Sequence, residues 1–201
     1  MTVAAGILSP FDYLRRERKS EVKNEYFQGN VYQMAGASEN HNLIVTNVIA
    51  TLKNQLRSRR ENKCRIYPSD MRVKTETGLY TYPDIVVVCG ERQFEGNKRD
   101  VLLNPKVIIE VLSPSTKAYD RGKKFEHYRT IPSLTEYILI EQDSHQIEHY
   151  VCQYDGTWQL TTSRHVSDSI ELPTVGCTLS LVDVYEDVEF DSGGHPKWNG
   201  R

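Results

Sequence analysis

Apolar positions recur every three or four residues over one long stretch near the start of the chain. In residues 38–60 they fall at Leu43, Ile44, Val48, Leu52 and Leu56. This spacing is the period of an amphipathic helix. Ser38 or Asn40 can cap its first turn, because both side chains can accept a hydrogen bond from a free backbone N–H. The pattern therefore predicts a long first helix.

Apolar runs of strand length follow this helix. They are RIYPSDMRVKT (65–75), YPDIVVVCG (82–90) and KVIIEVL (106–112), and a fourth, EYILIEQ, covers 136–142. Between the last two, Asp120 can cap a helix that runs to Pro132. Strand, helix and strand have the composition of a right-handed parallel crossover. The sequence thus predicts an α/β fold with an αβββαβ core, in which a mixed central sheet is flanked by helices.

Shorter elements are expected at the periphery. Residues 24–32 predict two short strands joined at Gln28-Gly29-Asn30, and a later hairpin turns at Asp155-Gly156. A further strand and a short helix are expected within residues 177–188. We expect a single domain over residues 1–201 with its core in about 21–188, and a frayed polar tail at 191–201.

Charge and composition narrow the possible partners. The 201 residues are 38% hydrophobic, enough for a sizeable core, and the formal net charge is -2. Without an overall basic field, nucleic acid would have to be bound by local patches. Two candidates are LRRERK at 14–19 and the cluster Arg57, Arg59, Arg60, Lys63 and Arg65. Each alone is more commonly a solvated helix face.

The cysteines and the apolar runs bear on the cellular environment. Cys64, Cys89, Cys152 and Cys177 show no close spacing of the kind that zinc sites have. No apolar run approaches the length of a membrane span, and no signal peptide is evident. We therefore expect four free thiols in a cytoplasmic protein that does not enter a membrane.

Two carboxylates are candidates for a metal site. Asp84 stands at the start of the second strand, and Glu110 lies within an apolar run where a lone charge would be costly. If their strands are neighbours, both can face one point and bind Mg²⁺ or Mn²⁺. Alternatively, Asp84 forms a turn after Pro83, and Glu110 pairs with a buried Lys or Arg.

The order of these motifs resembles a known superfamily. Tyr82-Pro83-Asp84 followed by Glu110 on the next strand resembles the PD-(D/E)XK nucleases, which have a restriction-endonuclease-like fold. More closely, the blocks AGASENHNLI, YPSDMRV, GLYTYPDIVVV, IIEVLSPSTKAYDRGKKFEHYR, IPSLTEYILI and ELPTVGCTL resemble the Uma-two family of predicted restriction endonucleases. The resemblance implies Mg²⁺ or Mn²⁺ as the cofactor, bound by Asp84, Glu110 and the carbonyl of Val111.

The superfamily lysine is absent from its usual place. The pattern requires Glu-x-Lys, but Glu110 is followed by Val111 and Leu112. The resemblance makes Lys124 the replacement, on the helix after the third strand. Lys123 is the rival, but adjacent helix positions point roughly 100° apart, so only one of the two can face the site.

Four further polar residues are candidates for supporting roles: Asp70, Glu25, His41 and Asp120. Asp70 can face the same side of the sheet as the site, while the other three lie in blocks that resemble the family. For Asp120 a helix cap is an equal alternative, and His41 at a helix start is more often a capping or packing residue.

These observations favour a metal-dependent endonuclease acting on nucleic acid, with DNA as the expected substrate and Asp84, Glu110 and Lys124 as the catalytic set. The alternative is an inactive nucleic-acid- or protein-binding module on the same scaffold. A glycosidase with a carboxylate pair ranks lower. A homodimer is also expected, because cutting both strands needs two sites.

Overall fold

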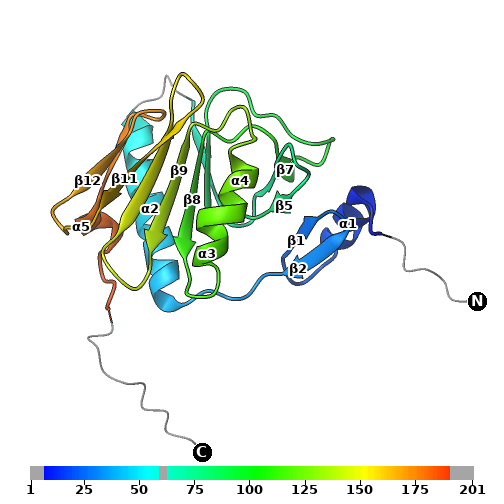
Figure 1. The fold of residues 1–201 in the computed structure, drawn as a ribbon, viewed down its shortest axis with the longest axis horizontal. Helices are drawn as coiled ribbons and strands as arrows, with labels where there is room; N and C mark the ends of the chain where they lie inside the picture. Colours follow the sequence, from blue (N-terminus) through cyan, green and yellow to red (C-terminus); the bar gives the residue numbers. More distant parts are fainter. Residues whose placement is uncertain (1–6, 59–62, 191–201) are drawn as a thin grey trace, which may run out of the picture.

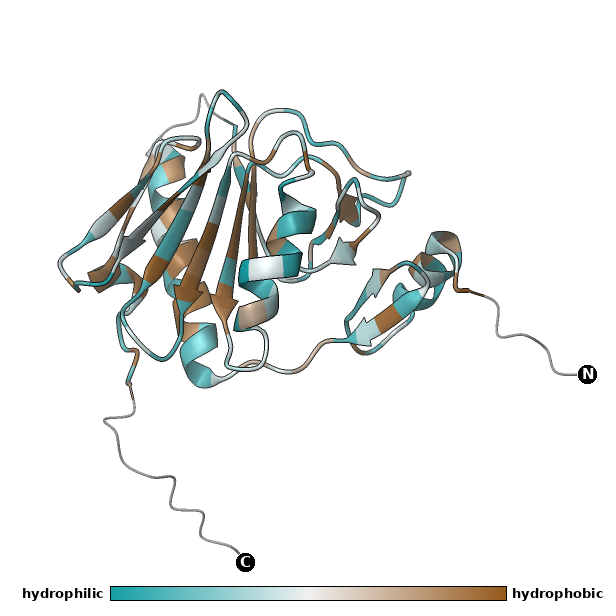
Figure 2. Cartoon of the chain, viewed as in Figure 1, coloured by the Kyte–Doolittle hydropathy of each residue, from teal (hydrophilic) through white to brown (hydrophobic). Residues whose placement is uncertain are grey.

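A six-stranded mixed sheet forms the centre of the molecule in the computed structural model, which describes residues 7–58 and 63–190 (Figure 1). Its strand order is β11-β10-β9-β8-β6-β3. The strands are β3 (Arg65–Pro68), β6 (Ile85–Val88), β8 (Val107–Leu112), β9 (Glu136–Glu141), β10 (Ile147–Cys152) and β11 (Trp158–Ser163). The apolar colouring in Figure 2 follows the middle of this sheet, as expected for strands buried on both faces.

Helices cover the two faces of the sheet. α2 (Glu39–Ser58) packs on the face that carries the odd-numbered residues of β6 and β8, such as Val87 and Ile109. A second helical segment covers the other face, where Val86 and Ile108 point. This segment consists of α3 (Lys117–Tyr119), a π-helical turn (Asp120–Lys124) and α4 (Phe125–Tyr128). The alternation of side chains along each strand therefore produces two separate cores.

The strand pairing agrees with the predicted αβββαβ core, although the run 65–75, predicted as one strand, ends at Pro68 as β3 and continues at Arg72 as a strand of another sheet. β6 and β8 are antiparallel neighbours with Ile85 opposite Ile109, and β8 and β9 are parallel with Glu110 opposite Leu139. The expectation that the strands carrying Asp84 and Glu110 lie side by side is confirmed. Ser38 also caps α2, since its Oγ accepts the N–H of His41 at 3.2 Å.

A second sheet was not predicted as such. It has the order β2-β1-β5-β4-β7 and consists of β1 (Asn24–Phe27), β2 (Asn30–Gln33), β4 (Arg72–Lys74), β5 (Tyr80–Thr81) and β7 (Val101–Leu102). α1 (Pro10–Glu17) packs against it through stacked tyrosines, Tyr13 and Tyr26. The predicted turn between β1 and β2 is present, with Gly29 at a φ of 87°. The sheet matters for the site because β1 and β5 contribute residues to it.

β10 and β11 form the hairpin expected at the C-terminal side, and β13 (Cys177–Ser180) and α5 (Leu181–Val184) are the expected strand and short helix. β12 (Ser169–Leu172), which pairs with β13, was not predicted. The expected frayed tail at 191–201 lies outside the described residues, and the assignment of one domain stays a prediction. Over the two described ranges, no helix has the length and apolar character that crossing a membrane requires.

The start of the second helical segment differs from the prediction. Asp120 does not cap the N-terminus of the segment, because α3 begins three residues earlier and Asp120 is the first residue of the π turn. Its carboxylate instead lies 3.4 Å from the ammonium of Lys124, four positions later. Residues four positions apart share a helix face, and the two side chains form this pair within the π turn.

The expectation of four free thiols is wrong. Cys64 and Cys89 form a disulfide. The reason is the register of β3 and β6, in which Arg65 faces Val88, so the next positions outward are Cys64 and Cys89. No local cysteine motif reveals this pairing. Because these two cysteines are bonded to each other, they no longer support the expectation of a reducing, cytoplasmic environment.

Candidate active site

Glu110 is the buried centre of the candidate site. It lies on β8 among Ile108 and Leu112, on the face covered by the second helical segment, and only 4% of it is exposed. Its Oε1 lies 2.9 Å from the ammonium of Lys124 and accepts the Tyr128 hydroxyl at 2.7 Å. These contacts offset part of the cost of burying a carboxylate.

Asp84 lies beside Glu110, in the bend just before β6. Its Oδ2 accepts the backbone N–H of Val111 at 2.8 Å and lies 3.1 Å from Nε2 of His41. The Asp84 N–H in turn donates to Oε2 of Glu110 at 3.3 Å. One oxygen of Asp84 is thus fixed by the neighbouring strand and by the first turn of α2, while no hydrogen bond from the described residues reaches Oδ1.

Lys124 is the cation of the site. Besides Glu110, its ammonium lies 3.4 Å from Asp120 and 3.5 Å from Glu25, and the residue is 6% exposed. Lys123 is exposed instead. Burial alone would lower the pKa of Lys124, but the charges of Glu110 and its neighbours outweigh this and raise the pKa well above the ordinary value. Lys124 is therefore an ammonium at neutral pH.

Burial raises the pKa of Glu110 from 4.5 to about 8, against the opposing effect of the Lys124 charge and with a further increase from Asp84. The raised pKa of Glu110 and the raised pKa of Lys124 can hold together without a metal. When Glu110 is protonated, the charges of Glu25 and Asp120 still favour the ammonium form of Lys124. Without a metal, Glu110 keeps a proton more readily than a free carboxyl group.

Three of the four supporting residues predicted from the sequence meet at this site. Glu25 reaches Lys124 from β1, His41 reaches Asp84 from α2, and Asp120 reaches Lys124 within the π turn. Asp70 does not join them. Its side chain is 82% exposed and pairs with Lys23 at 2.8 Å, because it lies in the turn between β3 and β4 rather than on a strand facing the site.

The structure adds residues that the sequence analysis missed. Tyr128 donates its hydroxyl to Glu110, and Thr81 on β5 donates its hydroxyl to Glu25. Tyr128 follows Lys124 by four positions and so shares its helix face, which was the one available signal. Thr81 gave no signal, because its position depends on the unpredicted second sheet.

The donor atoms suit a hard cation. Within the described residues, no three His, Cys, Asp or Glu side chains cluster as ligands for a metal. The available oxygens come from two carboxylates and from the backbone. The N–H of Val111 points toward Asp84, and N–H and C=O of one strand residue leave the same edge, so its carbonyl faces the same way. Such a set fits Mg²⁺, which keeps several waters.

Fold and site together define the class of restriction-endonuclease-like proteins. A protein of Anabaena variabilis, described as "a putative nuclease belonging to DUF820", shares the fold, with a TM-score of 0.68 over 83% of this chain and 91% of that chain at 20% identity.

The chain belongs to the Uma2 family, described as "Putative restriction endonuclease", which matches residues 10–182. Two proteins of Synechocystis sp. are similar to this chain in sequence. The protein sll1609 is 40% identical over 77% of this chain and 86% of its own length. The protein slr1290 is 36% identical over 91% of this chain and 94% of its own length.

Proposed function

We propose that the protein is a metal-dependent endonuclease that hydrolyses phosphodiester bonds in DNA. The observation that carries the proposal is the meeting of Asp84, Glu110 and Lys124 at one point, where β6 begins and β8 ends. Membership of a family described as restriction endonucleases supports the same reaction class. The rarity of a buried lysine held among three carboxylates adds to this, because such sites are seldom kept for stability alone.

Each residue has a defined task in this proposal. Asp84 and Glu110, with the carbonyl of Val111, would hold Mg²⁺ or Mn²⁺, and Mg²⁺ supplies an acidified water and neutralises phosphate charge. His41 and the Val111 N–H fix Oδ2 of Asp84, which leaves Oδ1 for a ligand. Lys124 orients the attacking water and stabilises the charge that develops on the phosphate.

Glu25 and Asp120 position Lys124, and Tyr128 positions Glu110. When Glu110 loses its proton to hold a cation, Lys124 can keep its own contacts with Glu25 and Asp120. The ammonium therefore stays at the site while one of its three partners takes up another role. This division of contacts explains how a lysine on a helix can replace one on the strand.

The test is cleavage of supercoiled plasmid DNA by the purified protein with Mg²⁺ or Mn²⁺. Cleavage should require the cation and be lost in Glu110→Ala, while Glu171→Ala, an exposed glutamate on β12, should behave as wild type. An RNA substrate in parallel reports the preference between the two nucleic acids. DNA binding without cleavage under any of these conditions would instead indicate an inactive binding module.

A further inference from the structure

The loop after β6 contains an unusual set of cations. Residues 90–100 carry Arg92, Lys98 and Arg99, all exposed, and over the described ranges none of the three takes part in an ion pair. Two acidic residues of the same loop are already engaged. Glu95 pairs with Lys74 at 2.6 Å, and Asp100 pairs with Arg18 at 2.7 Å. The loop has three acidic and three basic residues. Because Glu95 and Asp100 pair with cations outside it, Glu91 is its one acidic residue without an ion pair among the described residues, against three such cations.

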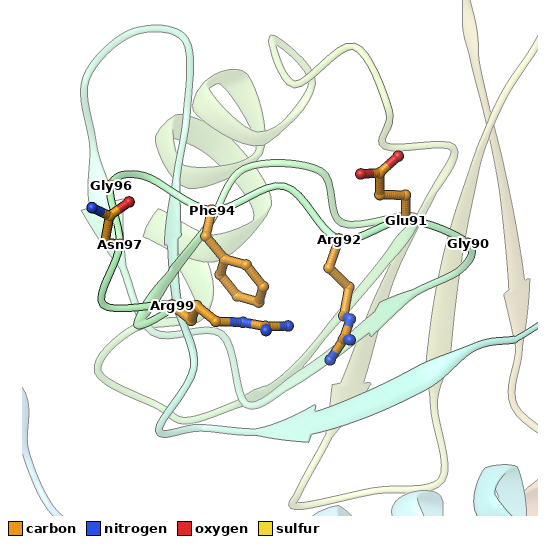
Figure 3. Close-up of a pocket in the computed structure, with 7 residues that line it drawn as sticks. All are labelled: Gly90, Glu91, Arg92, Phe94, Gly96, Asn97 and Arg99. Carbon is orange, nitrogen blue, oxygen red and sulfur yellow. The ribbon is translucent and has the colours of Figure 1, made fainter.

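Two of these cations, Arg92 and Arg99, border a pocket of about 530 Å³, whose other lining residues are Gly90, Glu91, Phe94, Gly96 and Asn97. Figure 3 shows the guanidinium groups of Arg92 and Arg99 turned toward the same space beside the Phe94 ring, while the Glu91 carboxylate points away from them. Two like charges facing one space repel each other, and an anion between them would remove that cost. The pocket thus has the electrostatics of an anion site.

Both arginines are held in place by neutral groups. The Arg99 guanidinium lies 5.2 Å from the centroid of the Phe94 ring, and Arg92 donates to the Tyr67 hydroxyl at 3.4 Å. A cation over a ring keeps its N–H donors available for an oxygen ligand. The backbone of Arg99 also has a φ of 57°, which residues other than glycine rarely adopt, so the surrounding fold must impose it.

The edge strand extends this surface. Side chains of a strand alternate between faces, so Arg65 lies on the same face of β3 as Tyr67, which Arg92 contacts. Arg65 is exposed, and over the described residues it too has no acidic partner. Arg65, Arg92 and Arg99 therefore form one basic surface, which we call the loop cluster.

We propose that the loop cluster binds phosphates of the nucleic-acid backbone at a second place, away from the cleaved bond. The inference rests on the proposed nuclease function. Gly90 follows Asp84 by six residues, so the two are at most roughly 20 Å apart along β6. At about 3.4 Å per base pair, this corresponds to roughly six base pairs of a duplex. The cluster would hold the flank of the substrate while the carboxylate site engages one phosphate.

The experiment measures binding separately from cleavage. A fluorescein-labelled 20-base-pair DNA duplex is titrated with protein in EDTA, and anisotropy is followed over a series of NaCl concentrations. Arg92→Ala/Arg99→Ala should weaken binding about tenfold and lower the salt slope by about 1.8, which is about 0.9 for each phosphate contact. Arg92→Lys/Arg99→Lys keeps both charges and should keep most of the salt slope.

Arg129→Ala/Arg164→Ala is the matched control, because it removes two exposed arginines that lie outside the basic segments named above. It should bind as wild type. An equal loss in both double variants, or no loss in Arg92→Ala/Arg99→Ala, would overturn the proposal, and thermal melting checks that each variant is folded. Displacement of the duplex by millimolar inorganic phosphate at constant ionic strength, together with no change in salt slope, would also overturn it in favour of a small-anion site.

The binding and cleavage measurements can refute the two proposals separately. Wild-type cleavage with unchanged binding in Arg92→Ala/Arg99→Ala would refute the loop cluster alone. Loss of binding in that variant, with no cleavage by wild type in Mg²⁺ or Mn²⁺, would refute the nuclease activity alone.

Discussion

Lys124 lies in an environment that is costly to build. Its ammonium is buried among Glu110, Glu25 and Asp120, at 2.9 to 3.5 Å. Burying so many charges costs free energy that a hydrophobic cluster of the same volume would not. The resemblance to the family pattern identified this lysine, and the angle between adjacent helix positions allowed only one of Lys123 and Lys124 to face the site. Lys124 is the one that contacts Glu110, and its role in cleavage stays a prediction.

If Lys124 acts on the water and the phosphate, Lys124→Ala should reduce the single-turnover cleavage rate by about 10²-fold or more, the scale of one electrostatic contact to a transition state. Lys124→Arg should also be impaired, because a planar guanidinium places its donors differently. Lys123→Ala is the matched control, since Lys123 is exposed. Equal rates for the Lys123 and Lys124 alanine variants would refute the role of Lys124.

The raised pKa of Glu110 makes stability depend on pH. Its folded pKa of about 8 exceeds the ordinary 4.5, so the protonated side chain contributes stability that is complete below about pH 4.5 and is lost as the pH rises through about 8. Glu110→Gln imitates the protonated form at every pH. In EDTA, urea unfolding should therefore show that the free energy of unfolding of Glu110→Gln, relative to that of wild type, increases from pH 5 to 8. Above pH 8 the difference should stay constant.

Glu171→Gln, on an exposed residue, should follow wild type over the same range. A constant difference between Glu110→Gln and wild type from pH 5 to 9 would mean that Glu110 keeps an ordinary pKa beside Lys124.

At the scale of elements, the helices and strands that could be predicted from the sequence are those with a clear short-range periodicity. α2, β6, β8, β9 and the β10–β11 hairpin each have a clear period or a turn of Asp-Gly type, and all five are present. The second sheet could not be predicted, because β5 and β7 have two residues each and depend on pairing with distant strands. The π turn was missed for a similar reason, since one wider turn leaves no mark on the hydrophobic period.

The candidate site shows the same division. Asp84, Glu110 and Lys124 lie on predicted elements and meet as expected, whereas Thr81 depends on the second sheet and Asp70 points elsewhere. Residues on regular elements could be placed from the sequence, and residues whose position depends on pairing between distant strands could not.

The bridge between Cys64 and Cys89 ties β3 to β6 beside the loop cluster, and it closes a loop with a sequence separation of 25. Closing such a loop restricts the unfolded chain, which stabilises the fold by about 3.5 kcal/mol in the chain-entropy account. A reductant should therefore lower the melting temperature of wild type. Cys64→Ser/Cys89→Ser should melt at the temperature of the reduced wild type and should not respond to reductant. An unchanged melting temperature on reduction would contradict a stabilising bridge.

At the scale of the whole molecule, a cation held by Asp84 and Glu110 would link one end of the central sheet to α2 and to the second helical segment, because His41 and Lys124 contact these same carboxylates. A ligand that binds only the folded state raises its free energy of unfolding, by about 2.7 kcal/mol at a concentration 100 times the dissociation constant. Mg²⁺ or Mn²⁺ should therefore raise the melting temperature of wild type. Asp84→Asn and Glu110→Gln should lose this gain, since each removes a charged ligand.

The gain should also be larger at pH 8 than at pH 6. Glu110 must release its proton before it can bind a cation, and its pKa of about 8 makes this release costly in acid. Asp70→Asn is the matched control, because Asp70 is an exposed carboxylate that pairs with Lys23. It should keep the full metal-induced increase. The same increase in Asp84→Asn and Glu110→Gln as in wild type would place the cation elsewhere, and the assignment of these two carboxylates as its ligands would then be wrong.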